Sequence, residues 1–154
     1  MTTVNNTVVS IGSGVTIRGL GRIYGRYQHA GLIVADDLFG GILELRGTIL
    51  QGTGAIEANG ATLRLSESAQ ITSIPMTASN GGGFAVVSGS NTFKGVNLTG
   101  PLALTNAQLN VDSCSITGDV TVSSAPMFVT SPNLTLNGNM LINPTANGGG
   151  TYLQ

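Results

Sequence analysis

Charged residues are scarce in this chain, and their scarcity sets the first limits on its function. Only 8% of the 154 residues are charged, against about 25% in ordinary soluble domains. The formal net charge is −1, so no overall field draws the chain to nucleic acid or to an anionic membrane. We therefore expect its partners to be neither membranes nor nucleic acids.

Cysteine, histidine and tryptophan are almost absent. The chain has one cysteine, Cys114, one histidine, His29, and no tryptophan. A single cysteine excludes an internal disulfide and a multi-thiolate metal site, and one His with one Cys does not make a usual zinc site. The motifs of phosphate-binding loops and of Gly-x-Ser-x-Gly nucleophiles are missing. The sequence thus predicts no metal, no cofactor and no catalytic residues.

Long apolar runs and targeting signals are missing as well. No run approaches the roughly 18 residues that cross a bilayer. The opening segment Met1–Asn6 has neither the basic nor the hydrophobic region of a signal peptide. We expect a protein that is made in the cytoplasm and carries no signal peptide.

Glycine and apolar residues are abundant. There are 23 glycines and the apolar fraction is 41%, which is too high for a disordered chain, while the lack of a Gly-X-Y period excludes collagen. The length suits one domain. Beyond Glu67 the only charged residues are Lys94, Asp112 and Asp119. Such a stretch favours an oligomer that hides part of its surface.

Apolar residues recur along the chain at steps of five to eight positions. They are Ile42, Ile49, Ile56, Leu63 and Ile71 in the first half, and Leu98, Leu104, Val111, Ile116, Val122, Val129, Leu136 and Ile142 in the second. A helical heptad would give a similar step, but Gly47, Gly52 and Gly54 would lie inside that helix, at about 1 kcal/mol each. The recurrence therefore indicates short strands.

The local pattern is that of β-strands. In Leu43–Arg46 and Leu63–Leu65, apolar and charged residues alternate, which places one face inward and one outward. Between these runs stand Gly, Asn, Ser and Pro, residues that form tight turns. Short strands with very short turns predict a β-solenoid, a three-sided parallel β-helix of about 20 residues per coil. A compact β-sandwich is the alternative.

The chain divides by composition into two regions. In residues 1–40 the apolar steps are irregular and glycine, arginine and tyrosine cluster. We interpret this region as an N-terminal cap or docking segment. Residues 41–154 form the predicted solenoid body with a C-terminal tail.

An arginine- and tyrosine-rich cluster in the N-terminal region is the sharpest candidate site. Its residues are Arg18, Arg22, Tyr24, Arg26, Tyr27 and His29. Arginine and tyrosine are the residues that most often anchor protein–protein contacts, so we interpret the cluster as a partner-docking site. A plain solvated surface is the second interpretation, and binding of nucleic acid or another polyanion is the third.

The carboxylates offer a weaker case for catalysis. A glycosidase holds two acids about 5–10 Å apart, and stacking of coils brings Glu44 near Glu67 or Glu57 if they share a face. Arg46 and Arg64 follow these acids in the sequence. Ion pairs between coils explain the same charges without any chemistry, so we expect no enzyme, with a polysaccharide depolymerase as the alternative.

A resemblance to a known class of proteins rests on two features, the short Ile/Leu/Val strands and the turns at residues 60–63, 97–100 and 133–138. Over residues 40–142 the chain resembles the β-helical parts of bacteriophage tail fibres, tailspikes and related virion appendages. This resemblance implies a homotrimer that assembles with other virion proteins and in some cases recognises a host-surface glycan. It also implies that the protein resides in the virion.

We therefore expect a structural component of a bacteriophage virion, such as a tail fibre, spike, minor fibre or capsid decoration. Two alternatives are carried with it. One is a tailspike module that binds or cleaves glycans, for which aromatic residues are few. The other is a fragment of a bacterial surface adhesin.

Overall fold

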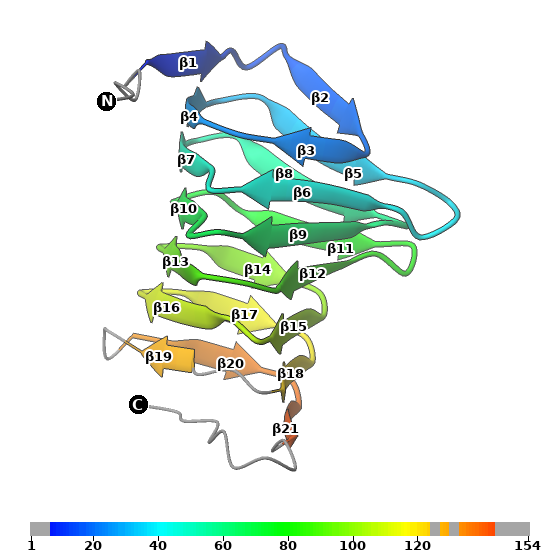
Figure 1. The fold of residues 1–154 in the computed structure, drawn as a ribbon, viewed down its shortest axis with the longest axis vertical. Coiled ribbons are helices and arrows are strands. Elements are labelled where there is room, and N and C mark those ends of the chain that lie inside the picture. Colours follow the sequence, from blue (N-terminus) through cyan, green and yellow to red (C-terminus); the bar gives the residue numbers. More distant parts are fainter. Residues whose placement is uncertain (1–6, 124–126, 130–132, 144–154) are drawn as a thin grey trace, which may run out of the picture.

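A computed structural model describes residues 7–123, 127–129 and 133–143 of the chain. These residues form 21 β-strands and no helix, wound into a β-solenoid (Figure 1). Each of seven coils contributes one strand to each of three sheets, and the strands pair in parallel. The predicted all-β solenoid is confirmed, and the alternative β-sandwich is not formed.

The three sheets are called A, B and C in chain order. Sheet A contains β1 (Val8–Ile11), β4 (Arg26–His29), β7 (Ile49–Gly52), β10 (Gln70–Thr72), β13 (Ser90–Lys94), β16 (Gln108–Asp112) and β19 (Met127–Val129). Sheet B contains β2 (Thr16–Gly19), β5 (Leu32–Asp36), β8 (Ala55–Asn59), β11 (Met76–Ser79), β14 (Asn97–Thr99), β17 (Ser115–Thr117) and β20 (Thr135–Asn137). Sheet C contains β3 (Gly21–Ile23), β6 (Ile42–Arg46), β9 (Thr62–Ser66), β12 (Gly83–Val86), β15 (Leu102–Thr105), β18 (Val120–Ser123) and β21 (Met140–Asn143).

The register confirms the predicted coil length of about 20 residues. Leu43 of β6 pairs with Leu63 of β9, 20 positions further on. The extremes lie near the N-terminus, where Thr16 pairs with Leu32 after 16 positions and Leu32 with Ala55 after 23. Coil 1 comprises β1–β3, and coil 7 comprises β19–β21.

The core is a set of apolar columns that run along the solenoid axis. In sheet B, Ile56 pairs with Met76 and Leu98 with Ile116, and these side chains are at most 1% exposed. Alternation along each short strand turns every second side chain inward. Because each buried Leu, Ile or Phe contributes about 1.5–3 kcal/mol, the columns supply most of the stability.

One buried polar side chain interrupts a core column at the corner between sheets C and A. Asn91 is 0% exposed, yet its amide is fully used. Its Oδ1 accepts from Ala69 N at 2.9 Å, and its Nδ2 donates to Ser88 O at 2.8 Å. Buried polar groups are tolerated when they are hydrogen-bonded in this way. Asn91 thus joins its own coil to the preceding one.

One position, at which residues of successive coils pair with one another, decides the shape of the corner between sheets B and C. At the end of the sheet B strands it holds, in coil order, Gly19, Ala35, Ala58, Ala78, Gly100, Gly118 and Gly138. Gly100 and Gly118 have φ of 131° and 137°, a region that glycine adopts far more readily than other residues. There the chain turns at once into sheet C, whereas the alanines let the strand continue outward.

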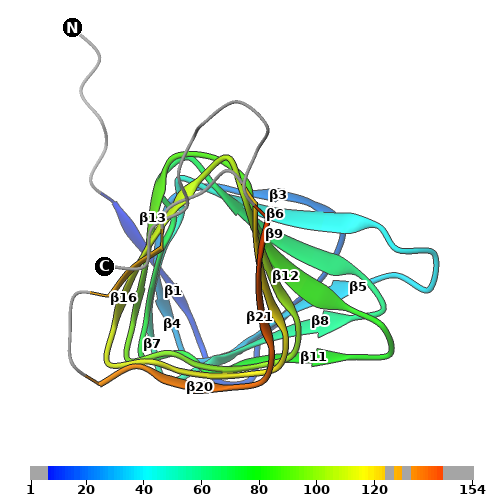
Figure 2. The same ribbon diagram turned by 90° about the horizontal axis from the view of Figure 1, so that it is seen from below.

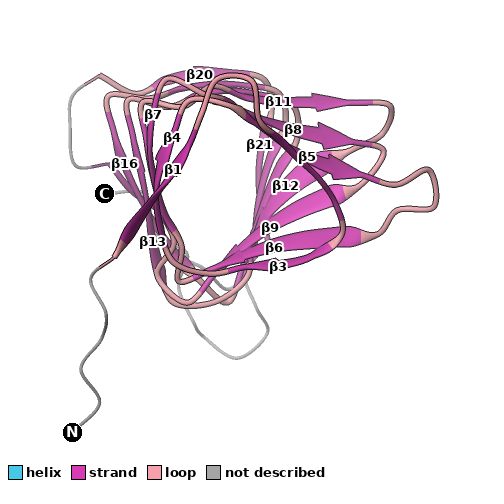
Figure 3. Ribbon diagram, turned by 90° about the horizontal axis from the view of Figure 1, so that it is seen from above, coloured by secondary structure: helices cyan, strands magenta, loops and turns pink. Residues whose placement is uncertain are grey.

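The alanine coils therefore carry a lateral projection, here called the fin. It consists of residues 36–41, 59–61 and 79–82, which join β5 to β6, β8 to β9 and β11 to β12; Figures 2 and 3 show these loops extending beyond the body. Polar side chains link its three layers. Asn59 Nδ2 donates to Asp36 Oδ1 at 2.9 Å, and Asn80 Nδ2 donates to Asn59 Oδ1 at 2.6 Å. Coils 2–4 are called the fin coils and coils 5–7 the narrow coils.

The N-terminal region belongs to the same ladder. Between residues 8 and 36 it forms β1–β5, which stack in the same three sheets as the rest of the chain. The division at residue 40 falls within coil 2, in the first loop of the fin, where the chain passes from β5 of sheet B to β6 of sheet C. A docking role for this region stays a prediction. The predicted C-terminal tail lies largely in residues 144–154, outside the described residues.

Candidate functional site

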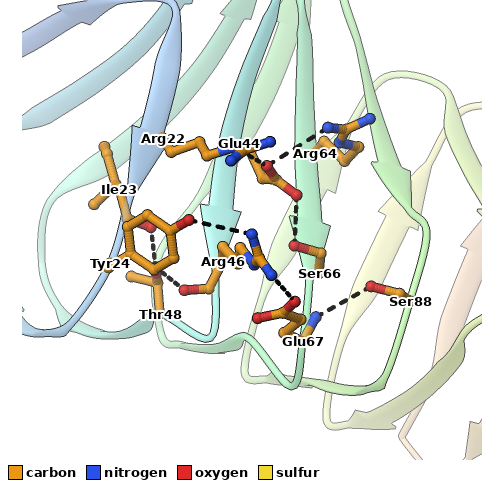
Figure 4. A network of polar contacts seen from close by, with 10 residues as sticks. All are labelled: Arg22, Ile23, Tyr24, Glu44, Arg46, Thr48, Arg64, Ser66, Glu67 and Ser88. Carbon is orange, nitrogen blue, oxygen red and sulfur yellow. Dashed lines mark hydrogen bonds and ion pairs between the residues drawn. The ribbon is translucent and has the colours of Figure 1, made fainter.

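The densest group of charges lies on the outer face of sheet C, in coils 1–3. Arg22 of β3, Glu44 of β6 and Arg64 of β9 occupy one ladder position on adjacent strands. Glu44 Oε2 lies 2.8 Å from Arg22 Nε and 3.5 Å from Arg64 Nη2 (Figure 4). Stacking of coils therefore places one carboxylate between two guanidinium groups.

Glu44 is 6% exposed and its carboxylate is held from a third side. The Ser66 hydroxyl donates to Glu44 Oε1 at 2.7 Å. This hydrogen bond is the main cause that lowers the pKa of Glu44; burial opposes it, and Arg64 and Arg22 add to it. The side chain stays ionised and acts as the anionic centre of the network.

A second pair continues the network beyond the ends of β6 and β9. Arg46 is ion-paired with Glu67, and its Nη1 donates to the Tyr24 hydroxyl at 3.3 Å. The guanidinium carbon lies 5.8 Å from the centroid of the Tyr24 ring, within the range of a cation–π contact. The hydrogen bond to Glu67 raises the pKa of Arg46, and the same bond lowers the pKa of Glu67.

These contacts test the interpretation of the carboxylates as ion pairs between coils. Glu44 and Glu67 both bind arginines from neighbouring coils, so the interpretation as ion pairs between coils is confirmed for them. Glu57 lies in β8 of sheet B, whereas Glu44 lies in sheet C. The predicted proximity of Glu44 to Glu57 is therefore wrong, because the two strands belong to different sides of the solenoid.

The structure distributes the six predicted docking residues over all three sides. Arg18 lies in β2 of sheet B, where its Nε is 2.8 Å from Asp36 Oδ2. Arg22 and Tyr24 are brought together on the side of sheet C, within the charged network. Arg26, Tyr27 and His29 all lie in β4 of sheet A. Residues close in sequence part here because one coil turns two corners within about 20 residues.

Within β4 the three candidates differ in exposure. Arg26 is exposed, and Tyr27 is partly buried against the core. The Tyr27 hydroxyl donates to Tyr24 O at 2.6 Å. His29 is 1% exposed and its Nε2 lies 3.0 Å from Ala55 O, so the imidazole packs inside a corner rather than on the surface.

The fin carries an apolar tip that sequence reasoning missed. Leu38 and Phe39 are 87% and 95% exposed. Asp37 fixes the turn beneath them, because its Oδ1 accepts from Phe39 N at 3.0 Å and its Oδ2 from Gly41 N at 2.9 Å. The signal was present as Asp-Leu-Phe-Gly-Gly, a turn sequence with two large apolar residues at its centre. A preorganised apolar tip is a surface suited to contact another molecule.

A shallow hollow of about 300 Å³ lies on the outer side of sheet C where the fin ends. Its lining includes the small residues Ala85 and Ala103 and the polar residues Thr62, Asp119 and Thr121. Asp119 Oδ1 accepts from Asn139 N at 3.1 Å. The hollow therefore offers a few hydroxyl and carboxylate oxygens beside a flat apolar surface.

Within the part of the chain that the structure describes, no three His, Cys, Asp or Glu residues are grouped to hold a metal ion. In that same part, no helix has the length and apolarity to span a bilayer. Cys114 is buried, and burial raises the pKa of its thiol, which disfavours the reactive thiolate.

Comparison of the chain with protein-family models, with curated proteins and with solved structures finds no match.

Proposed function

We propose that the chain is a structural component of a bacteriophage virion: a tail fibre, spike, minor fibre or capsid decoration. In this proposal it assembles as a homotrimer, contacts other virion proteins and resides in the particle, with contact to the host surface as a further role. It acts by shape and surface, without catalysis.

The observation that carries the proposal is the uncharged outer face of sheet B in the narrow coils. On sheet B the side chains of Thr99 and Thr117 are exposed, and no charged residue lies in its narrow-coil strands β14, β17 and β20. On sheet C, Ala103 and Thr105 are exposed. Flat, rigid faces with short uncharged side chains allow neighbouring chains to pack closely without desolvating charges.

The other half of the molecule supports a different contact. In coils 1–3 Arg18, Arg22 and Arg46 form ion pairs. The fin presents Leu38 and Phe39 to solvent. Exposed apolar groups rimmed by polar ones are typical of protein–protein contacts. We assign contact with other virion proteins to this half, and contact between trimer subunits to the narrow coils.

The test is the mass of the assembled protein and its location. Light scattering at low concentration should give three times the 15.6 kDa chain mass, and the assembly should resist heat and detergent. Crosslinking followed by mass spectrometry of intact particles should join the chain to virion proteins. A well-behaved monomer found only in cytosol would contradict the proposal.

A second candidate function is glycan binding, and the hollow below the fin favours it. Thr62, Asp119 and Thr121 provide polar atoms of the kind that bind sugar hydroxyls. A glycan array tests it: binding that Asp119→Asn abolishes and Asp112→Asn preserves would support a glycan site. An array without hits, together with no release of reducing ends from polysaccharide, would remove both glycan binding and cleavage.

A further inference from the structure

The solenoid leaves core side chains uncovered at both ends of the described ladder. Val9 of β1 stands in the column that continues through Tyr27 to Leu50; Leu50 is 0% exposed, but Val9 is 50% exposed. At the other end, Ile142 of β21 pairs with Val122. Val122 is 0% exposed and Ile142 is 44% exposed. Each end therefore presents an apolar cross-section of the core.

The backbone groups at the two ends are complementary. A residue whose side chain points inward donates to the following coil, as Val120 N does to Asn139 O at 2.8 Å. A residue that points outward donates to the preceding coil, as Thr135 N does to Cys114 O at 3.0 Å. Inward residues of coil 7, such as Leu136, therefore direct their backbone N–H and C=O groups away from the body, where no further coil follows in the ladder. Outward residues of coil 1 direct theirs away from the body at the first end.

The two ends also match in shape. Coil 1 turns between sheets B and C at Gly19, with φ of 126°, and coil 7 turns at Gly138. The wider fin coils lie between these ends. A second copy placed below coil 7 would set its Gly19 beneath Gly138 and continue the column of Gly100 and Gly118.

Charge does not oppose such a joint. No charged residue lies between residues 133 and 143 of coil 7. In coil 1, Arg18 and Arg22 project from the outer faces, where they pair with Asp36 and Glu44 of coil 2. The meeting surfaces are thus apolar side chains and backbone groups, the combination that makes exposed strand edges associate.

We propose that the chain associates head to tail with a second copy of itself, coil 1 of one chain stacking on coil 7 of the next. The three parallel sheets then run through the joint without interruption. A head-to-tail contact between unlike surfaces does not close on itself, so it generates a rod. This inference stands independently of the virion proposal, and it applies equally to single chains and to trimers.

Wild-type protein tests the inference first. Sedimentation velocity should show a mass that rises with concentration, and electron microscopy should show unbranched rods. Each chain adds seven strands to a sheet, or about 34 Å of rod at the ~4.8 Å spacing between strands. The fin should recur with that axial period.

Charge substitutions at the ends make the test directional. Val9→Lys places a charge at the first end and Ile142→Lys at the last, and each variant alone should keep the mass of one unit. An equimolar mixture of the two separately folded variants should give twice that mass and no more. The free last end of Val9→Lys binds the free first end of Ile142→Lys, and both outer ends of the resulting pair are blocked. Gln70→Lys, on an exposed side position of sheet A in coil 4, is the matched control and should form rods as the wild type does. Circular dichroism and thermal unfolding confirm that all three variants fold.

The outcomes separate this inference from the virion proposal. The unit mass, one chain or three, reports on the trimer and leaves the inference untouched. Wild type that keeps one mass at every concentration would overturn the inference, as would end variants that assemble like wild type. Assembly that begins only after removal of residues 144–154 would assign the last end to that segment and would also overturn it.

Discussion

The fin coils and the narrow coils are built on the same ladder, yet they differ in width and charge. In the fin coils, alanine at the corner position prolongs the strands outward, and Glu44, Arg46, Arg64 and Glu67 form ion pairs between coils. In the narrow coils, glycine closes the corner, and the one ion pair among the described residues joins exposed Lys94 to half-buried Asp112 at 3.5 Å. At the corner position itself the two kinds of coil differ by one methyl group, alanine in the fin coils and glycine in the narrow coils.

The largest effect is expected from exchanging the corner residues of the two kinds of coil. In Gly118→Ala, the new Cβ would lie 2.3 Å from Gly100 O, on a backbone with φ of 137°. We expect a loss of about 3 kcal/mol in the free energy of unfolding, measured by urea denaturation. The matched exchange in the fin, Ala58→Gly, should cost only about 1 kcal/mol. Equal losses in the two variants would show that this position does not define the corner.

The next effect concerns the charges of the two halves. Glu44→Gln keeps the shape of the side chain but leaves Arg22 and Arg64 without their shared counter-charge. We expect a loss of about 2 kcal/mol, less than for a fully buried pair because Arg22 is largely exposed. Asp112→Asn in the narrow coils is the comparison and should cost about 0.5 kcal/mol or less. If both cost the same in urea denaturation, the network adds nothing beyond an exposed pair.

The pH dependence of stability should follow from the same carboxylate. The pKa of Glu44 is lowered from its ordinary 4.5 by the Ser66 hydroxyl and the arginines. As the pH falls, this carboxylate is therefore protonated in the unfolded chain before it is protonated in the folded one. The resulting stabilisation is present above pH 4.5 and is lost as the pH falls through the lowered value. Urea titrations between pH 6 and pH 3 should therefore show a smaller loss for Glu44→Gln than for wild type. Parallel curves would assign the acid sensitivity to other groups.

The smallest effect is expected at the fin tip. Phe39 is 95% exposed, so Phe39→Ser should change the free energy of unfolding by less than about 0.5 kcal/mol. If the proposed virion function holds, the substitution should instead weaken binding to other virion proteins, measured by pull-down from disrupted particles. A large loss of stability would mean that Phe39 packs against the body in solution.

The sequence allowed the fold to be predicted because its two determinants are local. Alternation at Leu43–Arg46 sets a strand. Apolar residues at steps of five to eight positions, with turn residues between them, set the coil. The fin was not predictable in this way. The difference between Ala58 and Gly118 acquires meaning only when both are known to occupy one ladder position, which requires the register of every coil in between.

The candidate site was predicted only in part. The ion pairs followed from charges one coil apart, but the Arg18–His29 cluster separated because its residues span two corners and three sheets. His29 shows the limit clearly. A polar residue in an Arg/Tyr-rich stretch suggests a surface, and only the glycine opposite it, Gly54, reveals the space into which the imidazole fits.

The narrow coils have a consequence for how such a molecule changes length over evolutionary time. From Ser90 to Gln108, from Asn97 to Ser115 and from Leu102 to Val120, the register advances by the same 18 residues in all three sheets. A duplication or loss of one 18-residue segment there would replace each side chain by its ladder equivalent, and glycine would still meet glycine at the corner. The narrow coils thus behave as repeat units whose number can change without a change of register. The fin coils cannot be exchanged in this way, because their corners and ion pairs depend on particular neighbours.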